Sequence, residues 1–116
     1  MKNFGFLVFL NLLLFFFIPG CSKPQPSQHI KVVMKKYSIQ PEVIKVKTGE
    51  VVELEVSTLD VQHGFDIADL DIKEPVQFGK PAVFTFKAPA KGEYQITCGI
   101  ICGPHHDDMK AKLVVE

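Results

Sequence analysis

The chain has 116 residues with 13 basic side chains, all of them Lys, and 13 Asp or Glu, so its formal net charge at pH 7 is zero. This length fits one domain better than two, and the balanced charge provides no electrostatic surface for nucleic acid. About a quarter of the hydrophobic residues, 14 of 54, lie in the first twenty residues, and the short remainder of the chain can build only a modest core.

The N-terminus is typical of an export signal. Met1-Lys2 precedes an apolar run from Phe4 to Ile18. The run is shorter than the roughly 20 residues of a membrane span and fits the apolar core of a signal peptide. Ile18-Pro19-Gly20-Cys21 follows and resembles the bacterial lipobox, in which the Cys is lipidated and becomes the first residue after cleavage.

We therefore expect an export signal at 1–20 and a lipidated Cys21 at the start of a flexible tether, 21–28. Two Pro among polar residues favour an extended tether. The folded domain is expected at 29–116, as a membrane-anchored lipoprotein on the periplasmic side. An uncleaved anchor or an export signal without lipid would also place the domain outside the cytoplasm.

The body of the chain reads as short strands separated by turn signals. Residues 52–56 alternate Val and Leu with Glu, the pattern of a half-buried strand. Segment 69–79 is polar, contains Pro75 and Gly79, and is interpreted as a long connection. Strands are expected at 29–37, 42–47, 52–56, 61–67, 83–86, 92–98 and 111–115. No stretch has a sustained helical period, so the fold class is all-β, a sandwich or barrel.

A cluster of metal-ligating residues lies between the last two expected strands. Cys98, Cys102, His106 and Met109 fall within twelve residues, and His63 stands upstream near the start of another strand. Thiolate, thioether and imidazole select copper, zinc or iron over calcium or magnesium. Loops held on a rigid sheet are common places for such sites.

The cluster has several interpretations. Exported thiols tend to form disulfides, and two Cys with two His are the ligands of a structural zinc. Copper-delivery proteins with a thioredoxin-like fold also carry Cys-x3-Cys and a distant His, although there the pair precedes a helix. A blue copper site uses two His, one Cys and a weak Met, and a second Cys would let two sulfurs bridge two copper ions.

The full pattern is similar to the dinuclear copper A (CuA) centre of cytochrome c oxidase subunit II. It comprises Cys-x3-Cys-Gly-x2-His-x2-Met with Asp60-Val-Gln-His63-Gly-Phe upstream. The resemblance covers about 41–116 and is strongest to the compact subunit II of B-type haem-copper oxidases. It implies a cupredoxin-like Greek-key β-sandwich.

The resemblance also implies a role for each ligand. Cys98 and Cys102 would bridge two copper ions, and His63 and His106 would each bind one. Met109 and the main-chain carbonyl of Ile100 would be weak ligands, one to each ion. The spacing to Cys102 and Met109 selects His106 over the adjacent His105, which is expected to face solvent.

The implied function is single-electron transfer from a cytochrome c-like donor toward a terminal oxidase, with oxidase subunit I as a possible partner. The sequence offers no catalytic acid–base pair. Many oxidase subunits have Glu where this chain has Ile100, and that Glu helps bind magnesium at the subunit interface. This departure keeps a second hypothesis open: a free-standing periplasmic copper-binding protein for copper delivery or oxidase assembly.

Overall fold

The computed structural model describes residues 18–116. The predicted export signal at 1–20 therefore lies mostly outside the described residues. Residues 18–27 form an exposed, extended segment that leads to the first strand, and Cys21 lies in it. Within 18–116, no helix is long and apolar enough to span a membrane.

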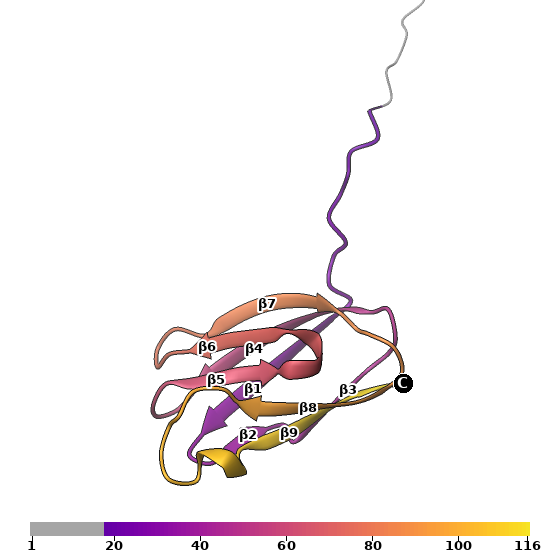
Figure 1. The fold of residues 1–116 in the computed structure, drawn as a ribbon. Coiled ribbons are helices and arrows are strands. Elements are labelled where there is room, and N and C mark those ends of the chain that lie inside the picture. The colour runs from indigo at the N-terminus through magenta and orange to yellow at the C-terminus, as the bar shows by residue number, and fades with distance from the viewer. Residues whose placement is uncertain (1–17) are drawn as a thin grey trace, which may run out of the picture.

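The described chain is a two-layer β-sandwich, which confirms the predicted all-β class (Figure 1). The four-stranded sheet has the order β2-β1-β4-β7, and the five-stranded sheet has the order β3-β9-β8-β5-β6. Pairs β1–β4 and β3–β9 are parallel, and the other pairs are antiparallel. The strands are β1 (Gln28–Lys35), β2 (Ser38–Gln40), β3 (Val43–Val46), β4 (Val51–Thr58), β5 (His63–Ile67), β6 (Ile72–Val76), β7 (Ala82–Lys87), β8 (Gly92–Cys98) and β9 (Lys110–Val115).

Alternating side chains produce the core. In β4, Val52, Leu54 and Val56 are fully buried while the intervening glutamates are partly exposed, because successive residues of a strand point to opposite faces. The rings of Phe65 and Phe84 meet across the two sheets with their centroids 5.9 Å apart. The inward faces of the sheets thus close over one apolar layer.

The prediction of a long connection at 69–79 is wrong in part. This segment contains the end of a 3-10 turn, η1 (Ala68–Leu70), and the whole of β6. Among the strands of residues 18–116, β6 pairs only with β5 and lies at the edge of its sheet. Pro75, which has no N–H, therefore removes no hydrogen bond to a neighbour on the other side. Nor did any pattern in the sequence indicate that the chain turns at Lys36–Tyr37 and returns as β2.

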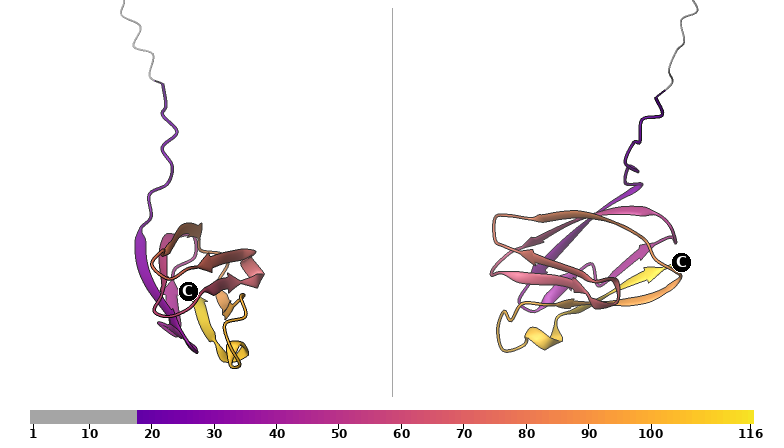
Figure 2. Two further views of the ribbon diagram at one scale, coloured as in Figure 1. Left: turned by 90° about the vertical axis from the view of Figure 1, so that its left-hand side faces the viewer. Right: turned by 45° about the horizontal axis from the view of Figure 1, so that its top comes forward.

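The two ends of the sandwich differ. Figures 1 and 2 place the connection between β8 and β9 at one end, and the entry of the N-terminal segment and the C-terminus toward the other. This β8–β9 connection, residues 99–109, contains η2 (His106–Asp108) and is the predicted ligand loop.

Candidate metal centre

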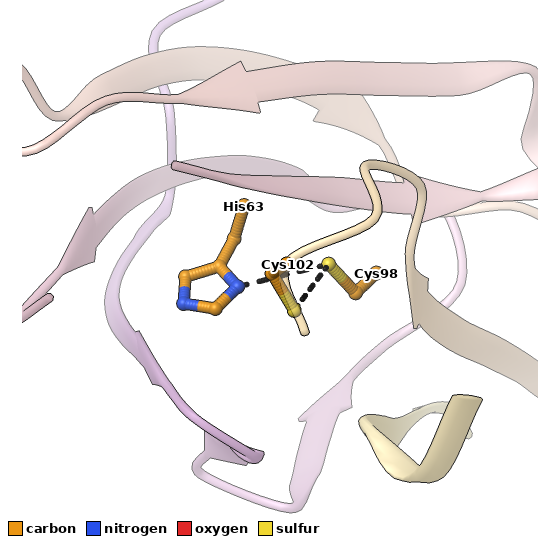
Figure 3. Close-up of side chains that lie close together, drawn as sticks. All are labelled: His63, Cys98 and Cys102. Carbon is orange, nitrogen blue, oxygen red and sulfur yellow. Dashed lines mark hydrogen bonds between the residues drawn. The ribbon is translucent and has the colours of Figure 1, made fainter. Parts of the chain in front are cut away.

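Three strand ends bring the predicted ligands to the same end of the sandwich. His63 is the first residue of β5, Cys98 is the last residue of β8, and Met109 immediately precedes β9. Cys98 lies opposite Phe65 in the β5–β8 ladder, and β8 pairs with β9 up to Thr97 opposite Lys110. Residues 35 or more positions apart in the chain therefore become neighbours (Figure 3).

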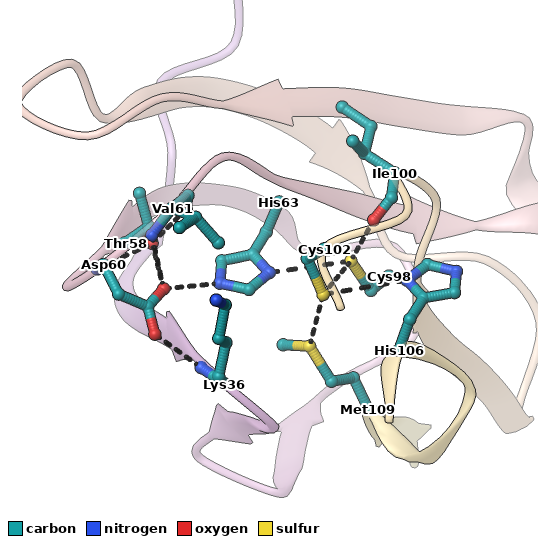
Figure 4. A network of polar contacts seen from close by, with 10 residues as sticks. All are labelled: Lys36, Thr58, Asp60, Val61, His63, Cys98, Ile100, Cys102, His106 and Met109. Carbon is teal, nitrogen blue, oxygen red and sulfur yellow. Dashed lines mark hydrogen bonds and ion pairs between the residues drawn. The ribbon is translucent and has the colours of Figure 1, made fainter. Parts of the chain in front are cut away.

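The sulfurs of Cys98 and Cys102 lie 3.9 Å apart at the centre of the site. The Nδ1 atom of His63 is 3.7 Å from the Cys98 sulfur, and Nδ1 of His106 is 3.8 Å from the Cys102 sulfur. Figure 4 shows the two imidazole rings on opposite sides of the sulfur pair. A disulfide would need the sulfurs about 2.05 Å apart, and both cysteines are free thiols here.

Two weaker donors complete the arrangement. The carbonyl oxygen of Ile100 is 3.1 Å from the Cys98 sulfur, and the thioether sulfur of Met109 is 3.5 Å from the Cys102 sulfur. Each thiol thus has one ring nitrogen and one weaker donor beside it. The structure brings together all six groups predicted as ligands, whereas Cys21 lies in the exposed N-terminal segment and His105 at the surface, with 66% of its side chain exposed.

The spacing of these atoms suits a metal. Donor atoms around one tetrahedral ion with bonds of about 2.0–2.3 Å lie roughly 3.3–3.8 Å apart. The two sulfur–nitrogen separations fall within this range. The sulfurs are closer than the roughly 4.6 Å of two metal–thiolate bonds end to end, so one ion can contact both. Thiolate, imidazole and thioether are donors that suit copper.

The site is largely shielded from solvent. His63, Met109 and Cys98 are buried, and Cys102 and His106 are partly buried. Burial disfavours the thiolate and, together with the adjacent Cys98, raises the pKa of Cys102 to about 11. Binding of a metal to this thiol therefore releases a proton.

Asp60 fixes the orientation of His63, a role that the sequence analysis did not assign to it. Nε2 of His63 lies 2.8 Å from Oδ1 of Asp60, and Nδ1 faces Cys98. Because the carboxylate can only accept, this contact favours the neutral tautomer with the proton on Nε2 and the lone pair on Nδ1. The main-chain N–H groups of Val61 and Lys36 donate to Oδ1 and Oδ2 at 2.6 and 2.7 Å. Partial burial opposes ionisation of Asp60, but these donors outweigh it and hold its pKa below the usual range.

Two glycines let the ligand loop lie close to β5. A Cβ at Gly64 would lie 3.0 Å from the nitrogens of Gly99 and Ile100, and a Cβ at Gly99 would overlap the carboxylate of Asp66. The N–H of Gly99 donates to the carbonyl of Gly64 at 3.1 Å. The Gly residues after His63 and after Cys98 were the available sequence signal for this contact.

A family model described as a cupredoxin-like domain matches residues 7–115 of the chain. Cytochrome c oxidase subunit 2 of Thermus thermophilus is 33% identical over 94 residues, which cover 78% of this chain and 68% of that protein. A second protein of this name, also from Thermus thermophilus, has the same identity over 78% of this chain and 55% of its own length. The predicted resemblance to this subunit is therefore confirmed.

Solved structures extend the likeness in fold. The periplasmic domain of cytochrome oxidase subunit II (CoxB) of Bradyrhizobium japonicum superposes with a TM-score of 0.73 at 21% identity, over 80% of this chain and 86% of that one. Auracyanin A, a blue copper protein of Chloroflexus aurantiacus, has a TM-score of 0.64 at 19% identity, over 76% and 98% of the two chains. At these identities the likeness concerns the fold alone.

Proposed function

This chain belongs to the cupredoxin-like domain family, and on that premise we propose that it binds two copper ions and transfers single electrons. The proposed ligands are His63, Cys98, the Ile100 carbonyl, Cys102, His106 and Met109. The relationship to cytochrome c oxidase subunit 2 supports copper and electron transfer, and the arrangement of the donors supports the proposal of two ions.

The observation that carries the proposal is the pairing of donors around the two sulfurs. Each thiol has its own imidazole nitrogen and its own weaker donor, and the imidazoles lie on opposite sides of the sulfur pair (Figure 4). Two bridging thiolates with one imidazole at each side suit two ions. A single tetrahedral zinc would need both imidazoles around one point and would leave Met109 without a role.

The protein's contribution is to hold the donors in place. Asp60 fixes the ring of His63, the Gly99–Gly64 hydrogen bond fixes the start of the ligand loop, and the N–H of Met109 donates to the carbonyl of His106 at 3.2 Å. When bound, copper supplies the one-electron couple. Donors fixed in this way rearrange little when the charge changes, and contacts of this kind tune the potential.

We further propose the setting of the domain. A cytochrome c-like protein is the electron donor, and a terminal oxidase, through its subunit I, is the acceptor. Residues 1–20 direct export, Cys21 carries a lipid, segment 21–28 is the tether, and 29–116 is the copper domain on the periplasmic side. The exposure of Cys21 supports its modification. Mass spectrometry of membrane-extracted protein tests this proposal, and an unmodified chain starting at Met1 would contradict it.

The test of the copper centre compares two Cys→Ser variants. The wild-type domain is expected to bind two copper ions per chain and, when oxidised, to give a purple colour and a seven-line electron paramagnetic resonance pattern. Cys102→Ser should lose the pattern because one bridge is gone. Cys21→Ser, in the exposed N-terminal segment, is the matched control and should keep both copper ions and the spectrum.

The same measurements distinguish electron transfer from the alternative function, copper delivery or oxidase assembly. A protein for copper delivery or oxidase assembly should bind one cuprous ion, stay colourless, and pass the ion to an acceptor. A copper-loaded wild-type domain that remains colourless after oxidation, or a Cys102→Ser variant with unchanged spectra, would contradict electron transfer through a two-copper centre.

A further inference from the structure

The turn between β1 and β2, formed by Lys36 and Tyr37, touches both sides of the candidate site. Its first contact is with the His63 side. The main-chain N–H of Lys36 donates to Oδ2 of Asp60 at 2.7 Å, and Oδ1 of the same carboxylate accepts from Nε2 of His63. Figure 4 shows this chain of contacts running from Lys36 to the buried imidazole. The orientation of His63 therefore depends on where the turn lies.

The second contact is with the His106 side. The hydroxyl oxygen of Tyr37 packs so closely on Gly103 that a Cβ at this position would overlap it. The Tyr37 ring also meets the ring of His105 edge-on, with centroids 5.2 Å apart and an interplanar angle of 69°. The carbonyl of Gly103 accepts the N–H of His106 at 3.2 Å, so Tyr37 packs on the residue that anchors the second imidazole.

We propose that the Lys36–Tyr37 turn is a brace that positions both imidazole ligands and couples them to each other. The inference rests on the proposed copper function for its effect on the metal, but the coupling is a property of the chain itself. Tyr37 is a positioning residue: it is partly buried against the core and acts through Gly103 and His105. Movement of the turn would displace the Asp60–His63 pair and the Gly103–His106 segment together.

The experiment removes the Tyr37 side chain and uses the other tyrosine as its control. Tyr94 in β8 also packs partly buried against the core, and its hydroxyl donates to the carbonyl of Ala90 at 2.7 Å. Tyr94 lies at the start of β8, four residues before Cys98. Both Tyr→Ala variants therefore remove the same type of side chain from the edge of the core. Tyr37→Ala does so beside the candidate site, and Tyr94→Ala does so away from it. Tyr37→Phe keeps the ring contacts with His105 and Gly103 but loses the hydroxyl contact, so its effect should have the same direction as that of Tyr37→Ala and be smaller.

The first readout is amide hydrogen exchange in the metal-free protein, relative to the amides of β4. Tyr37→Ala should speed exchange of the Lys36 amide, which is bonded to Asp60, and of the His106 amide, which is bonded to Gly103. Tyr94→Ala should change neither. If only the His106 amide responds, or if the two variants respond alike, the brace is refuted, and this conclusion stands whether or not the chain binds copper.

The second readout is the copper-loaded protein. Loss of an outer contact to a metal ligand typically weakens metal binding by about 10–100-fold. Tyr37 contacts no proposed ligand directly, so the low end of this range applies. Tyr37→Ala should release copper to a chelator up to about 10-fold faster and shift the reduction potential, while Tyr94→Ala leaves both close to wild type. Equal release rates and potentials in the two variants would overturn the proposal. If the wild-type protein binds no copper, the proposed function is refuted. The hydrogen-exchange experiment on the metal-free protein then still decides whether the brace exists.

Discussion

Replacing Asp60 with Asn tests how strongly the contacts around His63 control the site. Both carboxylate oxygens are acceptors: Oδ2 accepts from Lys36, and Oδ1 accepts from Val61 and His63. Asn has one acceptor oxygen and one NH2 group that can only donate. With its oxygen toward His63, Asn places the NH2 against the Lys36 N–H. With the NH2 toward His63, it places a donor against the Val61 N–H and favours the His63 tautomer protonated on Nδ1, the atom that faces Cys98.

The expected magnitude follows from these two orientations. In the first, the Lys36 N–H loses its hydrogen bond to a charged carboxylate, which is worth about 1.5–3 kcal/mol and less in a contact exposed to water such as this one. In the second, Nδ1 of His63 carries a proton and must lose it before it can bind a metal. We expect Asp60→Asn to lower the free energy of unfolding of the metal-free protein by about 1–2 kcal/mol and to weaken copper binding by about 10–100-fold.

Two assays measure these effects. Urea unfolding of the metal-free protein gives the change in stability, and competition with a copper chelator gives the change in affinity. Asp69→Asn is the matched control, because Asp69 is exposed in η1 and should affect neither quantity. An Asp60→Asn variant with the stability and copper affinity of Asp69→Asn would refute the assigned role of Asp60.

Three further changes probe the site and its support. Met109→Leu should keep both copper ions and mainly shift the reduction potential, because it removes only a weak donor. Leu has a volume similar to that of the buried Met109, so the substitution should lower the free energy of unfolding by less than about 1.5 kcal/mol. A loss of copper on quantification would contradict this. Gly99→Ala should destabilise the domain by about 1–3 kcal/mol in urea unfolding, because the new Cβ overlaps the Asp66 carboxylate, and adding Asp66→Ala should recover most of the loss. Burial raises the pKa of Asp66 above its ordinary value of 3.8, and the charge of Lys73 only partly offsets this. Asp66 therefore ionises at a lower pH in the unfolded chain than in the folded chain. As the pH rises above about 3.8, this difference increasingly lowers the free energy of unfolding. Asp66→Asn should raise the melting temperature at pH 7 and not below about pH 3.5; an equal shift at both pH values would contradict the burial argument.

The strands that alternate strongly in the sequence were predictable, and the weakly alternating ones were not. Val52, Leu54 and Val56 alternate with polar residues, so β4 was evident from the sequence alone. In β6, the apolar residues Ile72 and Val76 are separated by two charged residues and Pro75, so the sequence shows no alternating pattern of a strand. The strand forms because β5 offers a free edge, which is a property of the assembled sheet and not of the segment itself.

The candidate site shows the same division. Its donor groups could be predicted because Cys, His and Met are metal-ligating residue types and their spacing can be read directly from the sequence. The supporting contacts could not, because they depend on which segments the fold brings together. The Asp60 carboxylate depends on the Lys36 N–H of another strand end, and Tyr37 meets Gly103 across 66 positions in the chain.

These supporting contacts determine how the fold and a bound metal affect each other. The donors come from β5, the end of β8 and the ligand loop, so a metal that binds them adds a further link between segments that sheet hydrogen bonds and packing already hold together. Its binding free energy therefore adds to that of folding. Conversely, the sandwich sets the donor positions through Asp60, Gly99 and Tyr37, none of which is a proposed ligand. Relatives with the same six donor groups can therefore differ in potential and copper affinity through changes at these three positions alone.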